Sequence, residues 1–137
     1  MKTSARNQLK GSVTQIIEGK VNDEVVIDVS GTTFKAVITK EAVSEMGLAS
    51  GSEVYAIIKA SFVMVAKDKP GKISTRNVIE TTISDIIEGA VNCELKLSLG
   101  NATLTAIITE EAAKELALAK GDTVYALIKA SSIILAQ

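Results

Sequence analysis

The chain has 137 residues, of which 47% are hydrophobic and 23% charged, and its formal net charge is −1 at pH 7. It contains no histidine and one cysteine, which excludes a histidine-assisted nucleophile, an ordinary zinc site and a disulfide within the chain. The composition predicts a folded globular protein, and the single cysteine is typical of a reducing compartment such as the cytoplasm.

No segment of the sequence is suited to a membrane. The longest mostly apolar stretch, 54–65, is interrupted by Lys59 and is too short to span a bilayer. The N-terminal residues lack the apolar region of a signal peptide. We therefore expect a cytoplasmic protein with no membrane partner.

The first half of the chain predicts five strands and one helix. Thr39 is expected to cap a short helix that runs through Leu48, with the strands on either side of it. Runs rich in β-branched residues predict the strands at 9–17, 24–29, 32–38, 54–58 and 62–66. Five strands with a helix after the third favour a small, partly open Greek-key barrel of the OB type.

The second half repeats the first. A shift of 70 places residues 4–67 (the first copy) on residues 74–137 (the second copy) without a gap, and about 28 of these 64 positions are identical. Residues 68–73 hold the only proline and are typical of a linker. The sequence therefore predicts an all-β protein of two tandem five-stranded OB-type Greek-key barrels, each with one short helix after the third strand. The expected domains are 1–67 and 74–137.

Modules of this size bury little surface when they stand alone. We expect the two copies to pack against each other and against other chains, in a closed symmetric assembly.

The arginines are the most selective polar feature. The chain has only two, Arg6 and Arg76, and they occupy the same place in the two copies. A guanidinium offers a rigid fork of donors that suits an oxyanion. The same spacing fits a solvated arm before the first strand, or an arginine that holds a partner carboxylate, so the sequence leaves these interpretations open.

Three further matched clusters could contribute donors, and each has a structural alternative. Lys59-Ala60-Ser61 and Lys129-Ala130-Ser131 could surround an anion, or could be polar turns between strands. Thr39 and Thr109 could mark an anion site at a helix N-terminus, or could simply cap the helix. The glycine–asparagine segments at 18–22 and 88–92 could bind, or could be hairpin turns.

Four short stretches of the sequence resemble a known protein family. Ser4 to Gly11, Glu18-Gly19-x-Val21-Asn22, Ala36-x-Ile38-Thr39 and Ile58 to Ser61 resemble the Mop or molbindin family, whose domain is also the TOBE-type module of molybdate transporters and regulators. The resemblance covers both copies, although 78–81 departs from the pattern of 8–11.

The resemblance implies an OB-type fold that binds molybdate or tungstate at sites between subunits, in a homo-oligomer that is a trimer of two-domain chains. Together with the matched asparagines, it gives an oxyanion-binding set of Ser4, Arg6, Asn7, Thr39, Lys59, Ala60, Ser61, Ser74, Arg76, Asn77, Thr109, Lys129, Ala130 and Ser131. A second set consists of Gly19, Val21, Asn22, Gly89, Val91 and Asn92.

This set is rich in donors and poor in acids, with Glu24, Glu41, Glu45 and their counterparts expected on solvated faces. We expect the metal to be held as its oxyanion, with no direct side-chain coordination, no cofactor and no catalysis. The hypothesis is a cytoplasmic molybdate- or tungstate-binding protein for intracellular storage or homeostasis. The alternative is an OB-type single-stranded nucleic-acid binder or a regulatory assembly module. Few aromatics and an acidic pI argue against a nucleic-acid partner.

Overall fold

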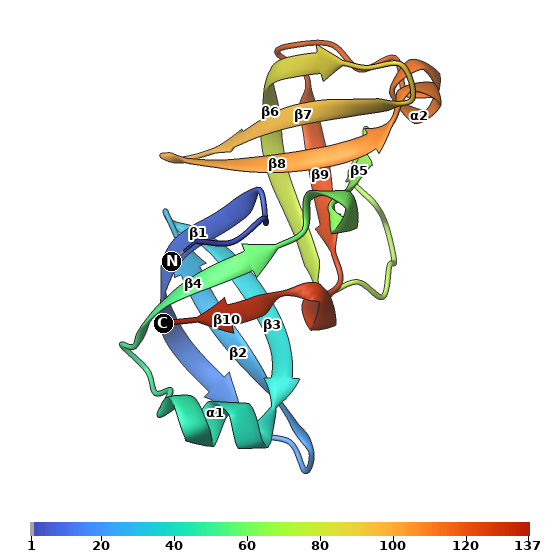
Figure 1. Cartoon of the computed structure of the whole chain (residues 1–137). Helices are drawn as coiled ribbons and strands as arrows, with labels where there is room; N and C mark the ends of the chain where they lie inside the picture. The colour runs from blue at the N-terminus through green and yellow to red at the C-terminus, as the bar shows by residue number, and fades with distance from the viewer. Residues whose placement is uncertain (1) are drawn as a thin grey trace.

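Two curled five-stranded antiparallel sheets make up the computed structural model, which describes residues 2–137 (Figure 1). The first copy forms β1 (Asn7–Ile17), β2 (Asn22–Val29), β3 (Thr32–Thr39), α1 (Lys40–Met46), β4 (Glu53–Ile58), the 3-10 turn η1 (Ala60–Phe62) and β5 (Met64–Ala66). The second copy forms β6 (Asn77–Glu88), β7 (Asn92–Leu99), β8 (Ala102–Thr109), α2 (Glu110–Glu115), β9 (Thr123–Ile128), η2 (Ala130–Ser132) and β10 (Ile134–Ala136). The predicted all-β class, with a short helix after the third strand of each copy, is confirmed.

The last strand of each copy leaves the sheet of its own copy. The strand orders are β10-β4-β1-β2-β3 and β5-β9-β6-β7-β8, so β5 and β10 are exchanged between the two sheets. In Figure 1 the chain passes from β4 through η1 into the neighbouring unit, and the C-terminal strand returns to the first. Ile134 pairs with Ile57, and Met64 pairs with Leu127.

The exchange corrects the expectation that each copy closes its own barrel. The sequence predicts a strand at 62–66, but η1 takes up residues 60–62 and the strand is shortened to Met64–Ala66. Lys59 and Val63 on either side of η1 are extended, so the turn directs the chain across to the other sheet and does not fold it back onto β4. The division of the sequence at 67 and 74 therefore does not follow the sheets.

The hairpin turns of the two copies touch each other. In the β2–β3 turn Ser30 has φ +52° and Gly31 has φ +84°, the left-handed pair that a two-residue hairpin favours. The equivalent β7–β8 turn contains Gly100 with φ +58°. The backbone N–H of Asn101 donates to Ser30 Oγ at 2.8 Å, and a Cβ on Gly100 would lie 2.8 Å from Ser30 O. Close approach and positive φ together require glycine at position 100.

One aliphatic core runs through both copies. Phe34 is fully buried, and Leu104 takes its place in the second copy. Outward-facing residues alternate with these along β2, β3, β7 and β8, as a strand period of two requires. The main members on the inner faces are Val25, Ile27, Ala36, Ile58, Cys93, Leu95, Leu97, Ala106 and Ile128. Among residues 2–137, no helix has the length and apolar character needed to cross a membrane.

Candidate functional site

A cavity of about 370 Å³ brings together five residues of the predicted set, and we call it the Arg6 pocket. Five residues of the predicted set line it, and they come from the segment just before β1 and from η1 with the residue before it, more than fifty residues apart: Ser4, Arg6, Lys59, Ala60 and Ser61. Its other walls are Thr3, Ala5, Ile57 and Phe62 of the first copy with Ile107, Ser132 and Ile134 of the second. The second copy thus contributes to the pocket that bears the first copy's donors.

The second copy forms an equivalent cavity of about 190 Å³, the Arg76 pocket. Val37 of β3 lies there at the position that Ile107 of β8 takes in the Arg6 pocket. The shift of 70 that aligns the two halves of the sequence therefore also relates the two pockets. The remaining lining residues are Ser74, Thr75, Arg76, Lys129, Ala130 and Ser131.

The 3-10 turns explain why a lysine, a small residue and a serine lie at each pocket. The N–H of Phe62 donates to Lys59 O at 2.9 Å, which closes η1, and Ser132 donates to Lys129 O at the same distance in η2. The first N–H groups of such a turn have no partner inside it, so they can donate to a bound anion. Lys59 Nζ lies 5.4 Å from the centre of the Phe62 ring, which holds the ammonium group at the pocket.

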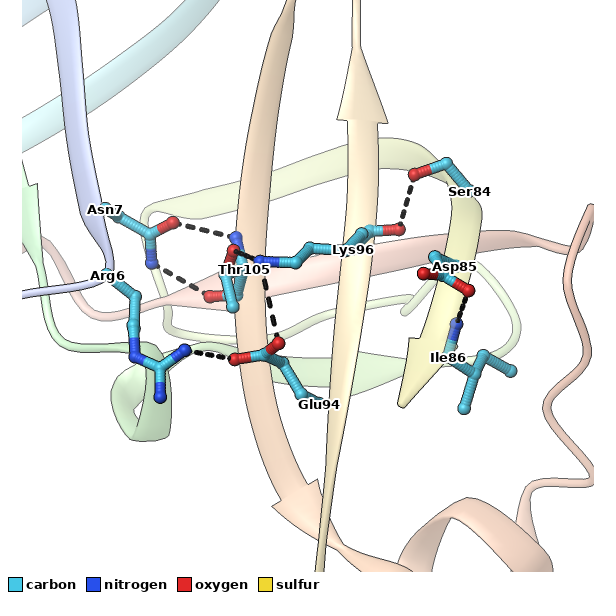
Figure 2. Close-up of polar contacts among 8 residues, drawn as sticks. All are labelled: Arg6, Asn7, Ser84, Asp85, Ile86, Glu94, Lys96 and Thr105. Carbon is cyan, nitrogen blue, oxygen red and sulfur yellow. Dashed lines mark hydrogen bonds and ion pairs between the residues drawn. The ribbon is translucent and has the colours of Figure 1, made fainter. Parts of the chain in front are cut away.

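Each pocket arginine contacts a glutamate of the other copy. Arg6 Nη1 donates to Glu94 Oε1 at 2.6 Å, and Arg76 Nε lies 3.7 Å from Glu24 Oε1 (Figure 2 shows the Arg6 pair). The glutamate side chains are only 16% and 17% exposed. The expectation that Glu24 and its counterpart lie on solvated faces is therefore wrong. The alternative of an arginine holding a carboxylate is realised, within one chain.

The two asparagines beside the arginines join the copies. Asn7 is buried, accepts the Thr105 N–H at 2.7 Å and donates to Thr105 O at 2.8 Å (Figure 2). It also donates to Ile58 O at 3.1 Å. Asn77 repeats these bonds with Lys35 and Ile128. Each side-chain amide acts as an additional peptide group between the sheets. Because both amide hydrogens are already donated, Asn7 and Asn77 position their neighbours and have no donor left for an anion.

The threonines before the helices lie outside both pockets. Thr39 Oγ accepts the Ala42 N–H at 3.1 Å, and Thr109 Oγ accepts the Ala112 N–H at 3.0 Å, so both are helix caps. Thr109 lines a cavity of about 660 Å³ together with Glu110, Glu111, Lys114 and Glu115. Neither threonine is among the residues that line the Arg6 and Arg76 pockets.

The second predicted set is divided between two places. Gly89 and Asn92 line a cavity of about 330 Å³ that also contains Arg6 and Glu94, whereas Val91 lines the cavity of Thr109. A Cβ on Gly89 would lie 2.5 Å from Asn92 O, which explains the glycine as part of a tight turn. The tight turn accounts for the glycine, while Gly89 and Asn92 also lie at a cavity next to Arg6.

In the first copy, Gly19 is positioned by Asp23, which accepts its N–H at 3.0 Å. Asn22 is placed by pairing with Thr39 in the β2–β3 ladder, while Val21 is 73% exposed. The three residues thus form a turn at the sheet edge.

A cluster beside that turn was not anticipated from the sequence. Asp23 is buried and Lys40 Nζ lies 3.3 Å from its Oδ1. Partial burial lowers the pKa of Lys40, but its bonds to Asp23 and Glu18 outweigh this and raise it overall. At the same places the second copy has Cys93 and Glu110; burial, Glu110 and Glu88 raise the pKa of the Cys93 thiol. The signal for this difference was the pairing of Asp23 with Cys93 under the shift of 70.

Two OB-type units with matched cation- and hydroxyl-lined pockets define a small-ligand binding protein of the β class. The model of the TOBE domain matches residues 3–65 and 73–135. The chain therefore belongs to the TOBE-domain family, and it carries the domain twice. No group of three or more acidic, cysteine or histidine side chains able to hold a metal ion was found in residues 2–137.

Several known proteins that are similar to the chain are named for molybdenum or molybdate. The chain is 47% identical over 139 aligned residues to the molybdenum-pterin-binding protein MopA of Rhodobacter capsulatus, covering 99% of this chain and 52% of the relative. With the same coverages it is 32% identical to the DNA-binding transcriptional dual regulator ModE of Escherichia coli. It thus spans about half the length of the curated relatives that it matches. A solved structure of the cytoplasmic molybdate-binding protein ModG with molybdate bound superposes with a TM-score of 0.93, at 42% identity and 98% coverage of both chains.

Proposed function

We propose that this chain binds molybdate, or the similar anion tungstate, in the Arg6 and Arg76 pockets. The observation that carries the proposal is the duplication of one donor set. Each pocket unites a serine, an arginine, a lysine and a second serine from two separated segments. The similarity to the molybdate-binding protein ModG supports this choice of anion.

The chemistry of the donors fits a tetrahedral dianion that accepts hydrogen bonds and donates none. Arginine, lysine, hydroxyl and backbone N–H groups donate, and the charged donors form the shorter and stronger bonds. The arginines retain N–H groups beyond those that face Glu94 and Glu24, because a guanidinium has five. Phosphate differs because at neutral pH it carries a proton that needs an acceptor, and the arginine, lysine and backbone N–H groups provide none.

The further proposal is that the pockets are completed by other copies of the chain, in a homotrimer. Phe62 and Ile134 line the Arg6 pocket and are 48% and 64% exposed, so its rim carries apolar surface that a neighbouring copy could cover. A covered pocket would bury the anion, and binding would then stabilise the assembly by mass action.

In the cell, this activity would serve cytoplasmic storage or homeostasis of molybdenum, as a binding function without catalysis. A second candidate is the ligand-sensing part of a regulator, which the similarity to the DNA-binding ModE favours. The two differ in whether an added oxyanion changes binding to DNA. In a gel shift with and without molybdate, retention of DNA that changes with the anion would favour the regulator, because storage predicts no retained DNA in either condition.

Titration calorimetry of the full chain with sodium molybdate tests the binding proposal. We expect saturable binding for the wild type and a loss of at least about tenfold in affinity for Arg6→Ala with Arg76→Ala. Sodium sulfate and phosphate are the matched competitor anions, and native mass spectrometry gives oligomer and stoichiometry together. Wild-type protein that takes up no molybdate at saturating concentration contradicts the proposal.

A further inference from the structure

The carboxylates facing the pocket arginines have no role in the proposed binding, yet both copies keep them. Glu24 and Glu94 are equivalent under the shift of 70, and each contacts the arginine of the other copy. Resting on the proposed function, we propose that Glu94 and Glu24 are counter-charges that limit the oxyanion affinity of the two pockets. Lys96 partly neutralises Glu94 at the Arg6 pocket alone. The Arg6 pocket therefore binds the oxyanion more tightly than the Arg76 pocket of the same chain.

Glu94 opposes anion binding whichever way Arg6 responds. If Arg6 keeps its 2.6 Å bond to Glu94, a dianion at the guanidinium lies close to a carboxylate of like charge. If Arg6 turns fully to the anion, it leaves behind a carboxylate that is only 16% exposed and has lost its strongest partner. Both routes cost free energy, so removal of the charge must tighten binding.

Lys96 is the element that distinguishes the two copies. Its Nζ lies 3.6 Å from Glu94 Oε2 and donates to Thr105 Oγ at 3.1 Å, which holds it beside the carboxylate (Figure 2). Lys96 neutralises Glu94 on the side away from Arg6. A Glu94 released by Arg6 would therefore still have a cation next to it.

The first copy has no equivalent of this lysine at Glu24. Val26 occupies the position of Lys96, and Lys35 stands opposite Val26 in the β2–β3 ladder. The ion pairs found among residues 2–137 join Glu24 to Arg76 and do not join it to Lys35. Counting each pocket's arginine and lysine together with the glutamate that pairs with the arginine and any lysine ion-paired to that glutamate, the Arg6 pocket has two net positive charges, from Arg6, Lys59 and Lys96 against Glu94. On the same count the Arg76 pocket has one, from Arg76 and Lys129 against Glu24.

Two unequal sites on one chain have a consequence for buffering. The Arg6 pocket fills at low oxyanion concentration, and the Arg76 pocket fills and empties at higher concentration. The free oxyanion level is then held over a wider range than two identical sites could cover.

The test isolates each pocket in the full chain. In an Arg76→Ala background, which leaves the Arg6 pocket, Glu94→Gln should bind sodium molybdate about five- to tenfold more tightly by calorimetry. Glu94→Asp is the matched control that keeps the charge, and its affinity should stay within about twofold of the background. Lys96→Val, which installs the residue of the first copy, should weaken binding about fivefold.

The reciprocal exchange is made at the other pocket. In an Arg6→Ala background, Val26→Lys should tighten molybdate binding about threefold. Thermal unfolding of each variant confirms folding. The exchanges at 26 and 96 keep the test valid if Glu94→Gln does not fold, because each leaves the arginine–glutamate pair of the pocket under test intact.

The outcomes separate this inference from the proposed function. Wild-type protein that binds no molybdate removes the function itself. Binding that is unchanged or weaker in Glu94→Gln overturns the counter-charge, and a matching loss in Glu94→Asp then assigns Glu94 to positioning Arg6. Equal affinities of the two single-pocket backgrounds, unaltered by Lys96→Val, overturn the inequality of the sites.

Discussion

The two copies share a scaffold but differ in the charged groups around it. Both have the buried asparagine that bonds to the opposite sheet, the arginine beside it and the 3-10 turn with lysine and serine. They differ where a buried polar group needs a partner: the first copy has Asp23 with Lys40, and the second has Cys93 with Glu110. Duplication has thus kept the donors of the pockets, while the supporting groups have changed in compensating sets.

In the second copy, the change from Asp23 and Lys40 to Cys93 and Glu110 is only partly compensated. Replacing aspartate by cysteine removes the acceptor of the turn N–H and the need for a lysine. Glu110 then stands in the place of Lys40, and its Oε2 is buried without a hydrogen-bond partner in the described structure. A carboxylate there is tolerated because its neighbour is an uncharged thiol.

The largest effect on stability is expected when the uncharged Cys93 beside Glu110 is replaced by a charged residue. Cys93→Asp puts a buried carboxylate beside Glu110 and Glu88, and we expect it to reduce the free energy of unfolding by about 3–5 kcal/mol. Adding Glu110→Lys rebuilds the arrangement of Asp23 and Lys40 and should recover more than half of the loss. Urea unfolding of the two single variants and the double variant measures the coupling. Additive losses would show that the copies do not compensate in this way.

The asparagine bonds provide the next test, because they should be equal in the two copies. Asn7→Ala leaves the Thr105 N–H and carbonyl buried without their partner, and we expect a loss of about 2–4 kcal/mol in unfolding free energy. Asn77→Ala is the matched variant and should lose the same within about 0.5 kcal/mol. A loss below about 1 kcal/mol for either, in urea unfolding, would mean that water replaces the amide.

Local elements could be predicted from the sequence because their signals are local. Thr39 before a run with Glu41 and Ala42 predicts a capped helix, and the structure has it at Lys40–Met46. The pocket residues before β1 and around η1 are matched positions of the two copies, and the structure brings Ser4, Arg6 and Lys59 together. Matching between copies therefore located the donors without any knowledge of their contacts.

Long-range partners could not be predicted, since a repeat gives the same pattern whichever sheet a strand joins. Nothing in residues 64–66 distinguishes pairing with β4 from pairing with β9. For the same reason the sequence did not predict the role of Asn7 and Asn77, which bond to the backbone of the other copy. It also did not predict the role of Glu94, because nothing in the sequence distinguishes it from other glutamates on strands. The capping bond of Thr39 also needed geometry, because capping and anion binding use the same residue.

The contact between the two hairpin turns predicts a smaller loss of stability, which should differ between Gly100 of the second copy and Gly31 of the first. Gly100→Ala adds a Cβ 2.8 Å from Ser30 O at a φ of +58°, and we expect about 2–3 kcal/mol lower stability. Gly31→Ala has a positive φ but open space around it, so it should lose only about 1 kcal/mol. Thermal or urea unfolding of the two variants makes the comparison. Equal losses would show that strain alone acts and that the turns do not press on each other.

The smallest expected effect is a pH dependence of the free energy of unfolding that Cys93 of the second copy contributes. Burial first, and then Glu110 and Glu88, raise the pKa of the Cys93 thiol above its unfolded value, which is about 8.5. Below that pH both states keep the proton and the contribution of Cys93 to stability is fully present. As pH rises toward the folded pKa, only the unfolded thiol loses its proton, so the free energy of unfolding falls. Urea unfolding between pH 7.5 and about 9.5 should therefore show a steeper decline for the wild type than for Cys93→Ala. Parallel declines would mean that the buried thiol ionises as readily as an unfolded one, and that the carboxylates beside it do not act on it.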